Sequence, residues 1–146
     1  FVPLHAPARV SSRNIRDELL KEDSLLPAIY LTQKLDIAVV GIGYPNEKSA
    51  IMATGYFKEN EIESLIDRKV AGELCMQFYD IYGDTAPYKD DNNVIGMDIS
   101  MLRSVPRSIG IAGGVEKLRA VRGAINGHYI NTLITDIECA EALISE

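Results

Sequence analysis

Two glycines stand beside a lysine in the part of the chain best suited to bind an anion. Gly113 and Gly114 follow an apolar run at residues 108–112, and Lys117 lies at the start of the helical pattern that comes next. Glycines let a backbone approach a ligand closely, and the free N–H groups at a helix start attract negative charge. The pattern favours a phosphate ester, but it is also compatible with a plain tight turn and a solvated lysine. It is not a Walker A sequence, so a nucleoside triphosphate is not indicated.

A second pair of glycines, Gly41 and Gly43, follows the apolar run at residues 36–40. A loop at this place could wrap around a ligand. Asn46 occupies the position of the third glycine in the dinucleotide-binding pattern G-x-G-x-x-G, so that pattern is incomplete. A simple turn after a strand is the alternative interpretation.

Three acidic residues stand at predicted element ends. Glu73 begins and Asp80 ends an alternating run that predicts one strand, which would hold them about 23 Å apart and outside one small site. Each is either an acceptor for a sugar hydroxyl or an ordinary turn or surface acid. Asp136 lies within Thr135-x-x-Glu138, a capping-box pattern, so it either starts a helix or orients a hydroxyl or Lys117.

No set of residues suited to covalent or metal chemistry is evident. His5 and His128 are isolated, and neither G-x-S-x-G nor HExxH occurs. Cys75 and Cys139 form no C-x-x-C pair and are expected to be buried, reduced thiols. We therefore predict no catalytic residue, no metal and no cofactor.

The composition is that of an ordinary folded domain. The chain has 146 residues, of which 47% are hydrophobic and 25% charged, and its formal net charge is -6. Disorder is excluded by the apolar content, and the acidic balance argues against the chain itself binding nucleic acid. No run reaches the ~20 apolar residues of a membrane helix, so no membrane partner is expected. No targeting segment is recognisable, and a cytoplasmic location is expected.

Helices and strands alternate along the chain. Helical patterns are found at residues 12–20, 24–35, 59–70, 115–126 and 136–144, and strand patterns at 36–40, 73–80, 94–99, 108–112 and 131–134. The apolar run at residues 36–40 predicts a strand buried on both faces, as in a parallel sheet. Residues 108–134 read as strand, Gly-Gly turn, helix and strand, a βαβ unit with parallel strands. The fold class is therefore α/β, with a layered parallel sheet.

This fold class would gather the candidate residues. Ligands of parallel sheets bind beyond the carboxyl ends of the strands, where the two glycine pairs and Asp136 are expected to lie. Residues 1–7 read as the end of a buried strand running into a proline turn, so we expect residues 1–146 to be part of a longer domain.

Four motifs in order resemble the effector domain of the SorC family, bacterial transcriptional regulators of sugar metabolism. They are residues 36–43; residues 71–74 with 78–80 and Gly83; residues 111–114 with Lys117 and Ala120; and residues 133–136 with Ala140. Each motif alone is weak, but the four in order are fairly specific and cover nearly the whole chain. The resemblance implies the fold of sugar-phosphate isomerases, glucosamine-phosphate deaminases and CoA transferases, as a partial domain.

The resemblance also implies a ligand and its contacts. The family senses a phosphorylated sugar, and here Lys117 would face the phosphate and Glu73 a sugar hydroxyl. Asp136 and the loop of Gly41 and Gly43 would be further contacts, beside the Gly113–Gly114 turn. The helix-turn-helix that binds DNA in the family is absent from this sequence, as is the first half of the effector domain with its phosphate-binding Gly-Gly-Thr-Thr-like loop.

The expected function is effector sensing without catalysis, in a homo-oligomer whose DNA contacts come from an N-terminal domain outside this chain. The alternative is an isomerase or deaminase on the same fold, which would need a carboxylate base such as Glu73 or Asp136.

Overall fold

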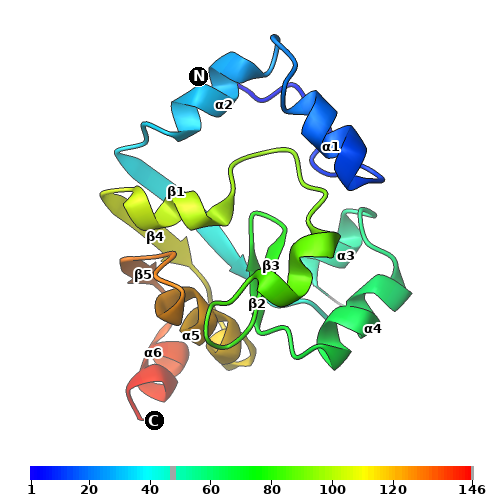
Figure 1. Ribbon diagram of the computed structural model, residues 1–146. Coiled ribbons are helices and arrows are strands. Elements are labelled where there is room, and N and C mark those ends of the chain that lie inside the picture. The colour runs from blue at the N-terminus through cyan, green and yellow to red at the C-terminus, as the bar shows by residue number, and fades with distance from the viewer. Residues whose placement is uncertain (47–48, 146) are drawn as a thin grey trace.

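A five-stranded mixed sheet with the strand order β3-β2-β1-β4-β5 organises the molecule. The computed structural model describes residues 1–46 and 49–145 (Figure 1). Strands β1, β4 and β5 run parallel to one another. Strand β2 runs antiparallel to both of its neighbours, β1 and β3. The strands are β1 (Ile37–Gly43), β2 (Gly72–Leu74), β3 (Gln77–Tyr79), β4 (Arg107–Ile111) and β5 (Thr132–Ile134).

The helices fall mostly where the sequence places them. Ser12 caps the first, because its hydroxyl accepts a hydrogen bond from the Ile15 N–H, and Pro27 lies in the first turn of the second, as expected. The α-helices are α1 (Arg13–Leu19), α2 (Leu26–Thr32), α3 (Ala50–Ala53), α4 (Glu59–Asp67), α5 (Leu118–Asn126) and α6 (Ile137–Ile144). The 3-10 helices are η1 (Ala86–Asp91), η2 (Ile99–Ser104) and η3 (Val115–Lys117).

The predicted βαβ unit is confirmed as β4, α5 and β5. Its two strands are parallel neighbours, and α5 lies against β1 and β2. Ala120, Val121 and Ala124 on the inner side of α5 are completely buried, together with residues of β1 and η2. This helix therefore covers one face of the sheet and begins beside the carboxyl ends of β1 and β4.

The single strand predicted over residues 73–80 is wrong. The chain instead reverses at Cys75 and Met76, whose φ angles are 52° and 62°, and forms the antiparallel hairpin of β2 and β3. Tight hairpin turns need such positive φ values and usually recruit Asn or Gly, so the sequence carried no turn signal here. Because the chain reverses between them, Glu73 and Asp80 are not held about 23 Å apart by one extended strand. Asp80 forms its own turn, accepting hydrogen bonds from the N–H groups of Tyr82 and Asp84.

The expectation that the first strand is buried on both faces is also wrong. Ala38 and Ile42 of β1 are buried, but Ile37 and Val39 on the other face are 55% and 62% exposed. Ile111 and Ile134 lie on the same open face, where they are paired in register. The apolar run reflects an apolar face that no described element of this chain covers.

Two threonine substitutions distinguish the two faces. Val39→Thr is expected to change the free energy of unfolding by less than about 0.5 kcal/mol, as for an exposed site. The matched Val121→Thr, at a fully buried position, should cost about 1–3 kcal/mol because it buries a hydroxyl. Chemical denaturation of both variants measures the difference. An equal loss in both would show that something covers Val39.

Three smaller expectations are also corrected. Residues 94–99 form no strand: Val94 makes only an isolated bridge with Arg9. The start of the chain is exposed rather than the end of a buried strand, since Phe1 and Val2 are open to solvent. Cys139 is buried as expected, but Cys75 is exposed.

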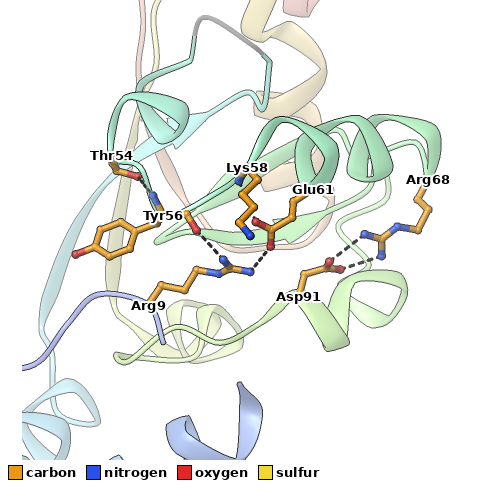
Figure 2. Close-up of polar contacts among 7 residues, drawn as sticks. All are labelled: Arg9, Thr54, Tyr56, Lys58, Glu61, Arg68 and Asp91. Atoms are coloured by element: carbon orange, nitrogen blue, oxygen red, sulfur yellow. Dashed lines mark hydrogen bonds and ion pairs between the residues drawn. The ribbon is translucent and has the colours of Figure 1, made fainter. Parts of the chain in front are cut away.

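A second apolar cluster joins α3, α4 and β3, and the N-terminal segment is fastened to it. Arg9 donates to the Tyr56 carbonyl at 2.6 Å, pairs with Glu61 at 2.8 Å and lies 4.1 Å above the centre of the Phe57 ring (Figure 2). Phe57 is buried in this cluster. These contacts hold the segment of Tyr56 and Phe57 and the start of α4 against the N-terminal segment. No described helix has the length and apolar character needed to cross a membrane.

Candidate ligand-binding site

A cavity of about 240 Å³ lies at the carboxyl end of β1, between the β2–β3 hairpin and the turn after β4. Parallel strands place ligand sites at this edge. Three of the predicted residues, Gly43, Glu73 and Lys117, line it. The full lining is Gly43, Tyr44, Asn46, Ser49, Ile51, Glu73, Glu116 and Lys117.

A backbone hydrogen bond fixes the position of the Glu73 carboxylate in this cavity. It lies on β2, and one of its oxygens accepts a hydrogen bond of 2.8 Å from the Met76 N–H at the hairpin turn. Burial raises the pKa of Glu73, while the Met76 hydrogen bond and the positive charge of Lys117 act in the opposite direction. The site therefore holds a desolvated acceptor in one orientation.

Gly43 provides the space for this carboxylate. It pairs directly with Glu73 across the antiparallel β1–β2 ladder, and a Cβ atom added at Gly43 would overlap the Glu73 carboxyl group. Gly41 lies two residues earlier, inside β1 and on the open face, and it does not line the cavity. The predicted loop at residues 41–43 is thus the last part of a strand.

Lys117 stands at the entrance to α5 rather than inside its first turn. Residues 115–117 form η3, and Lys117 is the N-terminal cap residue of α5. Gly114 begins this turn with a φ of 95°, which favours glycine. In the part of the chain that the structure describes, Lys117 forms no ion pair, but its charge acts on Glu73.

Asp136 fixes the Gly113–Gly114 turn from outside the cavity. One of its oxygens accepts a hydrogen bond of 2.5 Å from the Gly114 N–H, and the other accepts one of 2.8 Å from the Cys139 N–H. These bonds to Cys139 and Gly114 lower the pKa of Asp136. The predicted Thr135 cap is wrong, since Asp136 caps α6. Asp136 therefore positions the turn that carries Glu116 and Lys117.

Sequence reasoning missed five lining residues: the polar Tyr44, Asn46, Ser49 and Glu116, and the apolar Ile51. The first three follow β1 directly, and Glu116 follows the Gly-Gly turn, so the rule that ligands bind after parallel strands is the signal that could have found them. The cavity combines two carboxylates, one ammonium and several neutral polar groups. Such a set suits a polyhydroxylated ligand, because carboxylates accept hydrogen bonds from hydroxyl groups.

A family model described as "Putative sugar-binding domain" matches residues 1–145. The sorbitol operon regulator of Klebsiella pneumoniae is 33% identical over 94% of this chain and 44% of its own length. Its full-length crystal structure superposes with a TM-score of 0.84, covering 94% of this chain and 45% of that chain.

Two further relatives carry regulator names. The transcriptional regulator LsrR of Escherichia coli K12 is 36% identical over 95% of this chain and 45% of its own length. The deoxyribonucleoside regulator of Bacillus subtilis is 28% identical over 100% of this chain and 46% of its own length. This chain spans less than half the length of these curated relatives. It belongs to the sugar-binding domain family of SorC-type transcriptional regulators.

Proposed function

We propose that this domain senses a phosphorylated sugar for a transcriptional regulator and does not transform it. The observation that carries the proposal is the half-buried Glu73 side chain, which lines a cavity that Lys117 also lines. Glu73 and Glu116 accept hydrogen bonds from sugar hydroxyls, and Lys117 at the start of α5 binds the phosphate. The regulator names of the relatives favour sensing over an isomerase or deaminase reaction.

The proposed output is a shift between two arrangements of the regulator. A sugar that binds one arrangement more tightly increases its population, and the gain equals the difference in binding free energy. DNA contacts belong to an N-terminal domain outside this chain, which agrees with the net charge of -6 found here. We place the regulator in the cytoplasm.

Assembly into a homo-oligomer is part of the proposal. Leu26, Tyr30 and Leu31 on α2 are 44%, 54% and 46% exposed. We propose that a second copy covers this helix, because apolar side chains gathered on one helix gain free energy when they leave water. Sedimentation of the chain with and without Leu26→Ser and Tyr30→Ser tests this. A monomeric wild type over the concentration range studied would contradict it.

The experiment that tests the ligand compares sugars with their phosphate esters. Names of relatives suggest sorbitol and a deoxyribonucleoside as probes, each with and without a phosphate group. Lys117→Ala is expected to weaken binding of the phosphorylated form roughly tenfold or more, since it removes a charge-assisted contact. The unphosphorylated sugar should bind the variant and the wild type alike, as measured by calorimetry.

Lys34→Ala is the matched control, because Lys34 is exposed and lies on the segment after α2, far along the chain from the cavity. It should bind every probe as the wild type does. Equal affinity of wild type and Lys117→Ala for the phosphorylated probe would remove Lys117 from the site. Turnover of any sugar phosphate would instead favour the alternative that the protein is an isomerase or deaminase.

A further inference from the structure

A second cavity, of about 220 Å³, lies between α1 and η1, next to the β3 strand of the hairpin. Its floor contains the buried side chains of Phe78, Tyr88 and Ile99, with Gln77 only 5% exposed. Gln77 is held by its own hydrogen bonds to Met97, Asn92 and Ile99. The full lining is Arg13, Arg16, Gln77, Phe78, Thr85, Tyr88, Lys89, Asn92, Asp98 and Ile99. It shares no lining residue with the cavity of Glu73.

Both walls of this cavity are fastened to the body of the protein. On one wall, the Arg16 side chain donates to the Val94 carbonyl at 3.0 Å, which holds α1 in place. On the other, Arg68 of the segment after α4 donates to the Pro87 carbonyl and makes two hydrogen bonds, of 2.9 and 3.0 Å, to Asp91 (Figure 2). Arg68 thereby fixes η1, which carries Lys89. A cavity with fixed walls loses little entropy when a ligand binds.

Three of the four charged residues that line this cavity are positive, although the chain is acidic. Arg13, Arg16 and Lys89 face one lining acid, Asp98, whose carboxylate accepts hydrogen bonds from the backbone N–H and the hydroxyl of Ser100. Arg16 also pairs with Asp17 at 3.1 Å. Among the described residues, neither Arg13 nor Lys89 enters an ion pair.

We propose that this cavity is a second anion site, which binds a phosphate dianion or the phosphate group of a small monoester. Because Arg16 is already paired with Asp17, Arg13 and Lys89 are the two cations that would meet a dianion. Arginine provides planar N–H donors for phosphate oxygens, and lysine a point charge. Thr85 and Asn92 provide polar groups at the same cavity. The proposal does not depend on which sugar the Glu73 cavity binds.

The test is a titration of the chain with inorganic phosphate and, separately, with glycerol phosphate, at a constant ionic strength of about 0.15 M. Nuclear magnetic resonance follows the amide signals of Gln77, Thr85 and Asn92. The double variant Arg13→Gln/Lys89→Gln is expected to weaken binding at least tenfold, because each lost cation removes a charge-assisted bond. The control Lys34→Gln/Arg107→Gln removes the same net charge from exposed positions outside the cavity and should bind as the wild type does.

The two ligand sources give different results. Tighter binding of inorganic phosphate indicates free phosphate as the ligand, tighter binding of glycerol phosphate indicates a monoester, and equal binding indicates that only the phosphate group is recognised; each of these supports the site. Shifts confined to the residues 113–117 turn would overturn the proposal, as would equal binding by the control and Arg13→Gln/Lys89→Gln. Phosphate binding followed at Thr85 and Asn92 is read separately from sugar binding at the Glu73 cavity, whose lining includes neither residue, so failure of this site and failure of the proposed sugar site are separable.

Discussion

Glu73→Gln is expected to weaken sugar binding about 10- to 100-fold and, at neutral pH, to raise the midpoint temperature of unfolding. Losing a hydrogen bond from a sugar hydroxyl to a charged acceptor costs roughly 1.5–3 kcal/mol. The amide has the shape of the carboxyl group and keeps an acceptor oxygen for the Met76 N–H. The variant therefore removes the charge and leaves the hairpin contact in place.

The gain in stability follows from the desolvation of the carboxylate. Burial raises the pKa of Glu73 more strongly than the Met76 hydrogen bond and Lys117 lower it. The charged form is therefore less favourable in the folded protein than in the unfolded chain. A neutral amide avoids this cost, so binding and stability should change in opposite directions, as in sites that give up stability for function.

The pH dependence of unfolding shows the sign of the contribution that Glu73 makes to stability. Because the pKa of Glu73 is higher in the folded state, its contribution to stability is complete below the unfolded-state pKa and is lost as pH rises through the folded-state pKa. Wild-type stability should fall relative to that of Glu73→Gln across this window, and the two should converge in more acidic solution. Thermal unfolding of both proteins at a series of pH values measures the difference.

Glu63→Gln is the control, since Glu63 is exposed on α4 and does not line the cavity. It removes the same charge, so a general effect of net charge would appear in both variants. A lower unfolding temperature for Glu73→Gln at neutral pH would mean that Lys117 stabilises the ionised carboxylate more than burial destabilises it. Unchanged sugar affinity would remove Glu73 from the binding site.

The βαβ unit was predictable because its signals are local. The Gly113–Gly114 turn and the helical spacing of Leu118 and Val121 lie within a short stretch of chain, and each agrees with the same topology. Local signals did not predict which face of the sheet is covered by other elements. Val39 and Ile42 are equally apolar in sequence, yet one is 62% and the other 1% exposed, because burial depends on what lies against each face.

The candidate site was predictable only in part, for a related reason. The positions of Gly43 and Lys117 after strands could be inferred from local pattern. The contact of Gly43 with Glu73 depends on the register of β1 against β2, and that register depends on a turn at Cys75 and Met76 that lacks the usual turn residues. Sequence reasoning could name Glu73 as a candidate, but it could not place it against Gly43.

Gly43→Ala is expected to weaken sugar binding about 10- to 100-fold, as Glu73→Gln does, because it displaces the carboxylate that accepts the hydrogen bond from the sugar hydroxyl. The added methyl group would overlap the Glu73 carboxyl group and force it to move. The Met76 N–H then loses its acceptor, so the hairpin turn should also lose stability. Calorimetric titration with the tightest-binding sugar phosphate and thermal unfolding measure the two effects.

Gly41→Ala is the matched substitution within the same G-x-G sequence. A Cβ at Gly41 meets no atom within 4 Å, because this residue faces the open side of the sheet. Its sugar affinity should equal that of the wild type, and its stability should rise by about 0.4–1 kcal/mol through the lower entropy of the unfolded chain. Equal binding losses in the two variants would mean that the glycines act through backbone conformation rather than through the space left for Glu73.

The double variant Gly43→Ala/Glu73→Gln separates displacement of Glu73 from other consequences of the methyl group. If Gly43 acts only by making room for this carboxylate, the two losses in binding free energy should not add, since both remove the same interaction. Additive losses would require Gly43 to contact the ligand directly. The result thus decides whether Gly43 binds the sugar itself or serves to position the acid that does.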